Sequence, residues 1–196
     1  MGAGNGAQSF ALKELGFKVF AVGFSEELLA ELASHNSEIE IVNSDIRDLD
    51  FVASLNSNVI VCMGDTITHL ESLDEVMQLL KLIYGALSNN EKIIMSFRDL
   101  SVQKNDIERF IPVRNDSDRI LTCFLEDALD KVKVFDLLYE RNANGSWSFK
   151  NSFYYKLKIN FEWLAQQALL IGFKSIHVET LPSGLSVLIA QKDLKK

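Results

Sequence analysis

The first half of the chain alternates short apolar runs with amphipathic stretches. The runs at residues 18–22, 38–42, 58–63 and 92–97 predict β-strands, and run 58–63 is apolar enough to be covered on both faces. Helices are predicted at residues 7–15, 25–34 and 72–87, the last of which begins at a Ser72-Leu73-Asp74-Glu75 capping box. Alternation of strand and helix predicts an α/β fold built on a mostly parallel sheet.

The pattern changes beyond a polar connection at residues 100–118. Residues 120–125, 132–139 and 147–157 read as consecutive antiparallel strands, with Asn144-Gly145 as a hairpin turn. A helix at 161–171 and a hairpin at 175–192 about Pro182-Ser183-Gly184 follow, and we expect this hairpin to place a reversed strand at the edge of the sheet. The chain is therefore interpreted as one domain, 1–196, with residues 100–158 as an antiparallel β insertion.

A glycine-rich loop, Met1-Gly2-Ala3-Gly4-Asn5-Gly6-Ala7, precedes the first predicted helix. Glycines at alternate positions let the backbone turn tightly and approach a ligand, and the helix that follows aims free N–H groups at the loop. Gly2, Gly4 and Gly6 match the GxGxG pattern of methyltransferases, whereas Gly2, Gly4 and Ala7 match the GxGxxG/A pattern of dinucleotide-binding proteins. The loop predicts a nucleotide cofactor, and by itself it leaves these two classes open.

Composition narrows the function classes. The 196 residues are 47% hydrophobic and 24% charged, and the formal net charge of -7 argues against nucleic acid as the main partner. No apolar run has the length of a transmembrane helix and no secretory signal is present, so we expect a cytoplasmic protein. Cys62 and Cys123 lie in strand-like runs and are expected to be buried free thiols. No Cys or His spacing predicts a metal site.

Three stretches and the final hairpin resemble the class I S-adenosylmethionine-dependent methyltransferases. The stretches are MGAGNGAQSFALKELG, VNSDIRDLDF and VIVCMGDTITHL, and the resemblance covers essentially the whole chain. It implies a Rossmann-like methyltransferase fold, S-adenosylmethionine as cofactor and a small-molecule acceptor. The NPPY-type motif of adenine-N6 DNA methyltransferases is absent.

The resemblance also implies which residues meet the cofactor. The glycine loop would face the methionine part, and the loops after the third and fourth strands of the fold would meet the adenine and the rest of the cofactor. The residues at these positions are Gly2, Gly4, Gly6, Asp45, Ile46, Met63, Gly64 and Asp65. Asp45 can accept a hydrogen bond from the exocyclic amine while Ile46 packs on the ring. The alternatives are a solvated loop carboxylate for Asp45 and a plain turn glycine for Gly64.

Candidates for the acceptor side are fewer and less specific. His69 follows the fourth strand of the fold and can act as a general base, although a lining role fits the residue equally well. Arg98 can meet an anionic substrate or form a surface salt bridge. Tyr139, Trp147, Tyr154 and Tyr155 are candidate pocket residues on the insertion, which resembles a substrate cover; core packing is the alternative for such aromatic residues.

Two positions depart from the family pattern. The end of the second strand usually carries an Asp or Glu that binds both ribose hydroxyls, and this chain has Gly23 there. The fold's central first strand, which should precede the glycine loop, is missing. A longer natural chain, another segment that fills the gap, or a degraded relative would each account for its absence.

Three functions remain under consideration. The leading hypothesis is methyl transfer from S-adenosylmethionine to a small molecule. Gly23 and the missing strand leave open a non-catalytic binding module on the same fold, and the glycine loop leaves open a nicotinamide-dependent oxidoreductase. An unfilled strand position would also favour a homo-oligomer.

Overall fold

The computed structural model describes residues 1–35, 38–48, 57–181 and 184–193. The chain divides into two compact units. Unit 1 comprises Met1–Ile67, Asp74–Arg98 and Phe161–Lys196, and unit 2 comprises Thr68–Leu73 and Asp99–Asn160. Each unit is described by itself.

Unit 1 is the α/β part that the sequence predicts. Its elements are α1 (Ala7–Glu14), β1 (Phe20–Gly23), α2 (Glu26–His35), β2 (Glu40–Asn43), β3 (Ser57–Cys62), α4 (Leu73–Ala86, whose first residue belongs to unit 2), β4 (Leu87–Phe97), α5 (Phe161–Ile171), β9 (Phe173–Thr180) and β10 (Ser186–Lys192). The 3-10 turn η1 (Thr66–His69) connects unit 1 to unit 2 along the chain.

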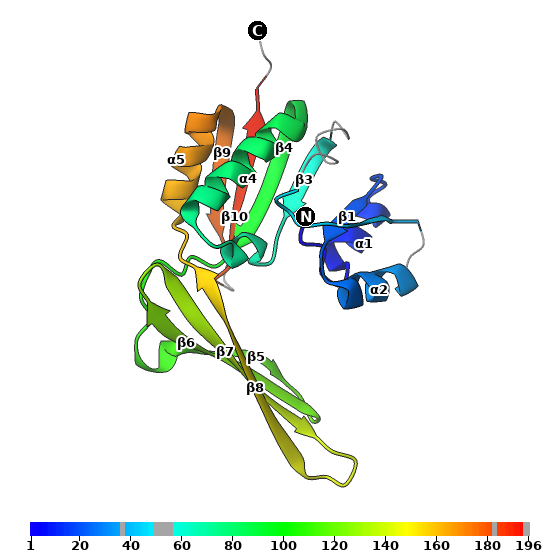
Figure 1. Cartoon of the computed structure of the whole chain (residues 1–196), viewed down its shortest axis with the longest axis vertical. Coiled ribbons are helices and arrows are strands. Elements are labelled where there is room, and N and C mark those ends of the chain that lie inside the picture. Colours follow the sequence, from blue (N-terminus) through cyan, green and yellow to red (C-terminus); the bar gives the residue numbers. More distant parts are fainter. Residues whose placement is uncertain (36–37, 49–56, 182–183, 194–196) are drawn as a thin grey trace. The chain divides into compact units, whose positions relative to one another are not determined.

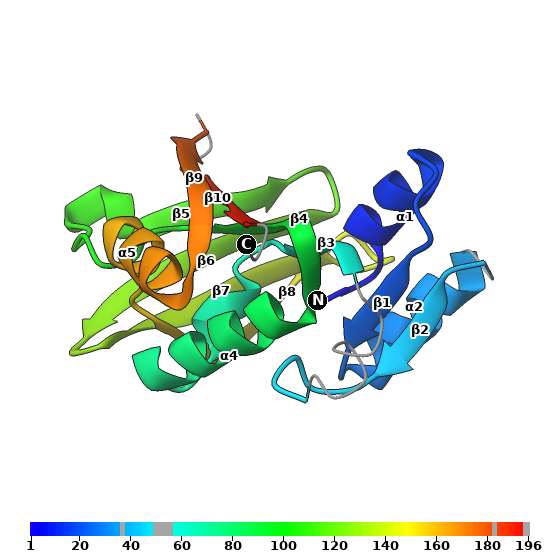
Figure 2. The same cartoon turned by 90° about the horizontal axis from the view of Figure 1, so that it is seen from above.

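The strands of unit 1 form two separate sheets (Figures 1 and 2). β1 pairs with β2 in parallel, and the second sheet has the order β3-β4-β10-β9. β3 and β4 are parallel, whereas β10 runs antiparallel to both β4 and β9. The reversed strand therefore lies inside the sheet, and the prediction that it forms the edge was wrong. No described strand lies between β1 and β3.

Apolar faces hold unit 1 together. α4 buries one stripe, Val76, Leu79, Leu80 and Ile83, each with at most 1% of its surface exposed, as its amphipathic sequence predicts. Leu73, the first residue of α4, is exposed. A smaller cluster under β1 contains Ala3, Val19, Ala21, Leu29, Leu32 and Ile39. The predicted turn at Pro182 and Ser183 falls outside the described residues.

Unit 2 is an antiparallel sheet of four strands in sequence order, and Figure 1 shows its long hairpins. The strands are β5 (Phe110–Asn115), β6 (Arg119–Ala128), β7 (Lys131–Arg141) and β8 (Trp147–Leu157). The three predicted strands and the turn at Asn144-Gly145 are confirmed. The connection 100–118 was predicted as a polar loop and instead contains η2 (Asp106–Arg109) and β5. β5 is an exposed edge strand that contains a proline, and its apolar residues are consecutive, so it lacks the alternation by which strands are recognised.

Candidate functional site

The glycine loop places its three glycines in the left-handed region, with φ of 66° at Gly2, 53° at Gly4 and 96° at Gly6. Their surroundings differ. A Cβ added at Gly2 would lie 2.4 Å from the Thr66 side chain, and one at Gly6 would lie 2.7 Å from Cγ of Leu32. A Cβ added at Gly4 would have no atom within 4 Å. Close packing therefore requires glycine at Gly2 and Gly6, whereas Gly4 faces open space that a ligand can enter.

Backbone hydrogen bonds hold this loop between two strands. The Ala3 N–H donates to the Val22 carbonyl at 2.9 Å, and the Met1 amino group donates to the Val61 carbonyl at 2.6 Å. α1 follows directly, with Gly6 as its N-cap and no side chain bonded to its free N–H groups. A helix start of this kind presents donors and positive potential to the loop.

The loop after β3 supplies a second open backbone position. Gly64 has φ of 74°, and a Cβ there would also have no atom within 4 Å. The Gly64 N–H donates to Oγ of Ser96 at 3.1 Å, and the Met63 carbonyl accepts from Oγ1 of Thr66 at 2.8 Å. Because these bonds secure the loop, Gly64 offers a fixed backbone surface to a ligand.

Asp65 is the buried carboxylate of this loop, and its partner is Arg98 at the end of β4. Oδ1 of Asp65 accepts from the Arg98 backbone N–H at 2.7 Å, and Oδ2 accepts from Nη1 at 3.0 Å. The Asp65 side chain is 7% exposed and the Arg98 side chain 42%. Asp65 was predicted to bind the cofactor and Arg98 to bind the substrate. In the structure the two side chains instead form a salt bridge, which was the alternative prediction for Arg98.

Asp45 forms a bidentate ion pair with Arg47, a residue that the sequence did not single out. The Arg47 side chain donates to Asp45 at 2.9 Å from Nε and at 2.8 Å from Nη2. These hydrogen bonds hold the pKa of the Asp45 carboxyl below its ordinary value. Nη1 of Arg47 also reaches Glu75, so the pair is tied to α4. The only feature of the sequence that could have indicated this ion pair is the position of Arg47 two residues after Asp45. Ile46 is buried beside it.

Gly23 is the last residue of β1, and its carbonyl accepts from the Ser44 N–H at 2.8 Å. A Cβ at this position would lie 3.4 Å from Cδ2 of Leu29, an ordinary contact. Ser25, the nearest hydroxyl along the chain, accepts from the Leu28 N–H at 3.4 Å. The position therefore has room for a side chain and lacks the carboxylate that the family usually has there.

His69 ends η1 and is exposed. Within unit 2, its ring lies beside that of Tyr154, with centroids 5.5 Å apart and planes at 33°. Tyr154 lies on β8 between Phe153 and Tyr155, and the alternation of a strand turns it to the opposite face from these two residues. The local sequence places Tyr154 on that face but does not predict that His69 meets it there.

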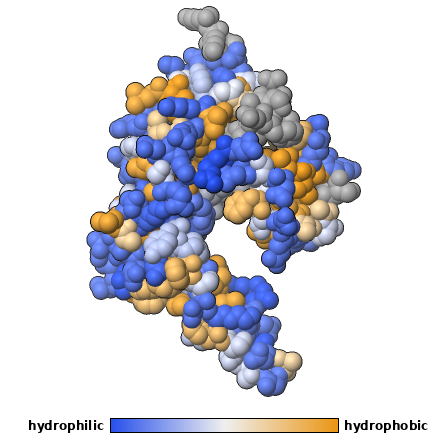
Figure 3. All heavy atoms as spheres, in the orientation of Figure 1, coloured by the Kyte–Doolittle hydropathy of each residue, from blue (hydrophilic) through white to orange (hydrophobic). Residues whose placement is uncertain are grey.

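Tyr139, Trp147 and Tyr155 share one face of the sheet of unit 2, where they are 44–48% exposed. Tyr139 pairs with Phe149, and their ring centroids are 4.8 Å apart. Trp147 and Tyr155 lie at opposite ends of β8, separated by roughly 26 Å at the rise of a strand. The three residues therefore do not converge on one pocket. Figure 3 shows apolar residues interspersed with polar ones over the β5–β8 part of the chain.

Other features of the described residues bear on partners. They contain no group of three or more His, Cys, Asp or Glu side chains that could hold a metal ion. Within the same ranges, none of the helices combines the length and apolar character needed to cross a membrane.

The arrangement fits S-adenosylmethionine in part. Gly4 and Gly64 are backbone positions open to a ligand, the start of α1 presents donors, and Asp45 is a carboxylate acceptor. The ribose carboxylate is absent at Gly23. The loops therefore suit the methionine and adenine parts better than the ribose.

Comparison with known proteins agrees with this fit. Residues 1–90 match the sequence model of a family described as a methyltransferase domain. No curated protein sequence matches the chain. Solved structures do match: an S-adenosylmethionine-dependent methyltransferase from Clostridium acetobutylicum ATCC 824 has a TM-score of 0.81 at 12% identity, over 98% of this chain and 82% of that chain.

Two further structures cover the chain equally well. CalS10, an amino pentose methyltransferase from Micromonospora echinaspora solved with bound S-adenosylmethionine, has a TM-score of 0.82 at 13% identity, over 97% of this chain and 80% of that chain. DesVI of Streptomyces venezuelae has a TM-score of 0.84 at 11% identity, over 97% of this chain and 81% of that chain. At such identities the likeness is one of fold. The match to the methyltransferase domain covers residues 1–90, and nearly the whole chain shares the fold of these solved methyltransferases.

Proposed function

We propose that the protein transfers the methyl group of S-adenosylmethionine to a small-molecule acceptor. The observation that carries the proposal is the pair of open, left-handed glycines, Gly4 and Gly64, on the two loops that flank α1 and follow β3. When bound, S-adenosylmethionine supplies a methyl group on a positively charged sulfur, which an electron-rich acceptor atom can attack.

The residues of unit 1 would bind and orient this cofactor. Gly2, Gly4 and Gly6 would form the backbone cradle of the methionine part, and Met63, Gly64 and Asp65 would form the facing loop. Asp45, kept ionised by Arg47, retains lone pairs that can accept from the adenine amine, with Ile46 beneath the ring. Asp65 would not contact the cofactor directly; its salt bridge to Arg98 would hold the loop after β3 in place.

The acceptor would be handled by unit 2. We infer that residues 100–158 cover the substrate and that His69 takes a proton from the acceptor. Because Tyr139, Trp147 and Tyr155 do not converge on one pocket, we propose that each is a separate candidate for a substrate contact, and that Arg98 of unit 1 is a further candidate. Transfer to a good nucleophile needs little beyond alignment and exclusion of water. Substitution of His69 would therefore change the rate of methyl transfer and the pH dependence of that rate more than it changes the affinity for the cofactor.

An amino sugar or another small amine is the class of acceptor to screen first. Two structural neighbours are named as an amino pentose methyltransferase and a sugar N-methyltransferase. The net charge of -7 suits a small molecule better than nucleic acid and is consistent with a cytoplasmic protein.

Isothermal titration with S-adenosylmethionine and S-adenosylhomocysteine tests the proposal. We expect saturable binding by the folded protein, weakened about tenfold or more by Gly4→Ala because the added methyl group enters the cradle. Gly145→Ala is the matched control: it also has positive φ, at 82°, with no atom within 4 Å, but lies in the β7–β8 turn. Absence of binding heat at millimolar ligand, or equal losses in the two variants, would overturn the proposal.

A further inference from the structure

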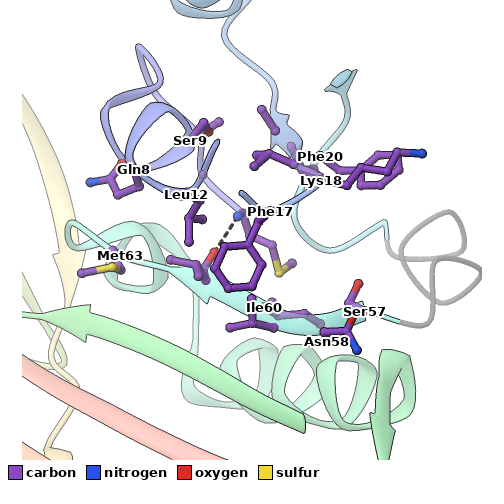
Figure 4. A pocket seen from close by; sticks show the side chains of 18 residues that line it. Gln8, Ser9, Leu12, Phe17, Lys18, Phe20, Ser57, Asn58, Ile60 and Met63 are labelled. Atoms are coloured by element: carbon purple, nitrogen blue, oxygen red, sulfur yellow. Dashed lines mark hydrogen bonds between the residues drawn. The ribbon is translucent and has the colours of Figure 1, made fainter. Parts of the chain in front are cut away.

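Cavities of the two units differ in their charged side chains. Unit 1 contains a cavity of about 260 Å³ that is lined in part by Leu12, Phe17 and Ile60 (Figure 4). The one charged side chain among its described lining residues, Lys18, is paired with Glu40. Unit 2 contains a cavity of about 40 Å³, which we call the unit 2 pocket, and its lining includes two cationic side chains.

The unit 2 pocket combines apolar walls with these cations. Leu100, Leu125 and Val132 line it and belong to the buried cluster of unit 2. Lys104 and Arg109 line it as well, and both precede β5 along the chain. Apolar surroundings lower the local dielectric constant and so strengthen the attraction between opposite charges. A charged group that enters the pocket therefore meets two cations with reduced screening by water.

Arg109 is the residue whose bonding points to a ligand. Its Nε is buried and has no hydrogen-bond partner among the described residues. Its guanidinium lies over the ring of Phe124, with Cζ 4.7 Å from the ring centroid, and this contact uses a face of the guanidinium while the N–H donors lie in its plane. A buried donor without an acceptor costs free energy, and the cost is larger for a charged group. An oxygen acceptor beside Nε would remove this cost.

Asp127 is the acidic side chain among the described lining residues, and its charge is already balanced. Its Oδ1 lies 2.6 Å from Nζ of Lys158, a side chain that is only 17% exposed. Lys158 also donates to the Leu129 carbonyl at 2.8 Å, which holds the ammonium group in place. The positive charges of Lys104 and Arg109 are therefore in excess in the pocket.

Size and charge together select the class of ligand. A cavity of about 40 Å³ has room for a group of a few non-hydrogen atoms and excludes a ring system. Two cations match a phosphate dianion better than a singly charged carboxylate, and the in-plane donors of a guanidinium suit phosphate oxygens. We propose that the unit 2 pocket binds a phosphate group, as inorganic phosphate or as the end of a phosphate monoester, with Arg109 and Lys104 as its ligands.

Nuclear magnetic resonance of the unmodified chain tests the proposal, because the Nε–H signal of Arg109 reports on the donor in question. At constant ionic strength, inorganic phosphate should shift this signal saturably, with a dissociation constant on the order of 1 mM. Methyl phosphate distinguishes the two sources of the group. Binding as tight as that of inorganic phosphate, or tighter, assigns the pocket to a monoester, and weaker binding assigns it to the free ion.

Three variants assign the binding to its residues. Arg109→Gln should weaken phosphate binding about tenfold or more, as followed by the backbone amides of Gln103 and Lys104. Lys104→Gln should weaken it about threefold, and because Lys104 is exposed this variant keeps the fold. Arg114→Gln is the matched control: Arg114 is exposed on β5, is paired with Asp116 and does not line the pocket, so phosphate binding should be unchanged.

A signal that stays in place at about ten times the expected dissociation constant would overturn the proposal and leave water as the partner of Arg109. Equal weakening in Arg109→Gln and Arg114→Gln would overturn it too, because binding would then be nonspecific. The same holds if acetate binds as tightly as phosphate, since the pocket would not select a dianion. None of these measurements uses S-adenosylmethionine, so this proposal and the methyltransferase proposal can fail separately.

Discussion

Nη1 of Arg98 lies 3.0 Å from Oδ2 of Asp65, and this salt bridge ties the loop after β3 to the end of β4. Asp65 has a φ of 69°, which is uncommon for a residue with a side chain. The two hydrogen bonds from Arg98 therefore stabilise a strained loop conformation beside Gly64. The Asp65–Arg98 pair supports the candidate site. Its removal should change the conformation of the loop after β3, and through that loop the binding of a ligand.

Arg98→Gln should lower the free energy of unfolding by about 1–3 kcal/mol, because it leaves the buried Asp65 carboxylate with fewer partners. Urea denaturation followed by circular dichroism measures the change. Arg114→Gln is the control, since Arg114 and its partner Asp116 are both exposed and the loss of their ion pair should change the free energy of unfolding far less. Equal effects in the two variants would show that the Asp65–Arg98 pair is no stronger than a surface pair.

Gly23→Asp should raise the affinity for S-adenosylmethionine. The position has room for a Cβ, and a carboxylate there can accept from both ribose hydroxyls. Two such bonds correspond to about 2–4 kcal/mol, or tens-fold to several hundred-fold in the dissociation constant. Isothermal titration measures the gain, and Gly23→Asn, which is neutral and similar in shape, should give much less. Unchanged affinity in Gly23→Asp would contradict the ribose assignment.

Gly6→Ala should destabilise the fold more than Gly4→Ala does. Both positions have positive φ, but only the Cβ at Gly6 would meet the buried Leu32, at 2.7 Å from its Cγ. We expect an extra loss of about 1–3 kcal/mol from overpacking at Gly6. Thermal unfolding of the two variants measures the difference. If Gly4→Ala is the less stable variant, the open space at Gly4 is not present in solution.

Cys62 should resist alkylation in the native protein. It is buried, and burial raises the pKa of its thiol to about 11, so at pH 8 only about one thiol in a thousand is ionised. Cys123 is only half-buried, contrary to the expectation that both thiols are buried, and its thiol donates to Asp136. Mass spectrometry after iodoacetamide treatment should find Cys123 modified first. Equal rates without denaturant would contradict the burial of Cys62.

Local patterns predicted most of the elements. The helix Phe161–Ile171 agrees with its predicted bounds, because a capping residue and a terminal glycine mark its ends. β5 was missed, because an exposed edge strand with a proline has no apolar alternation. The reversed strand was predicted but misplaced at the edge of the sheet, because strand order depends on which backbone edges meet.

The sequence by itself determined the order of strands and helices, the glycine loop and the absence of a carboxylate at Gly23, since these depend on residue type and spacing along the chain. The tertiary structure decided which candidates act together: Asp65 with Arg98, Asp45 with Arg47, and Gly4 rather than Gly2 or Gly6 as the open position. Asp65 and Arg98 are 33 positions apart in the chain, and folding brings them together. Asp45 and Arg47 are only two positions apart, but the conformation of their loop decides that the side chains meet.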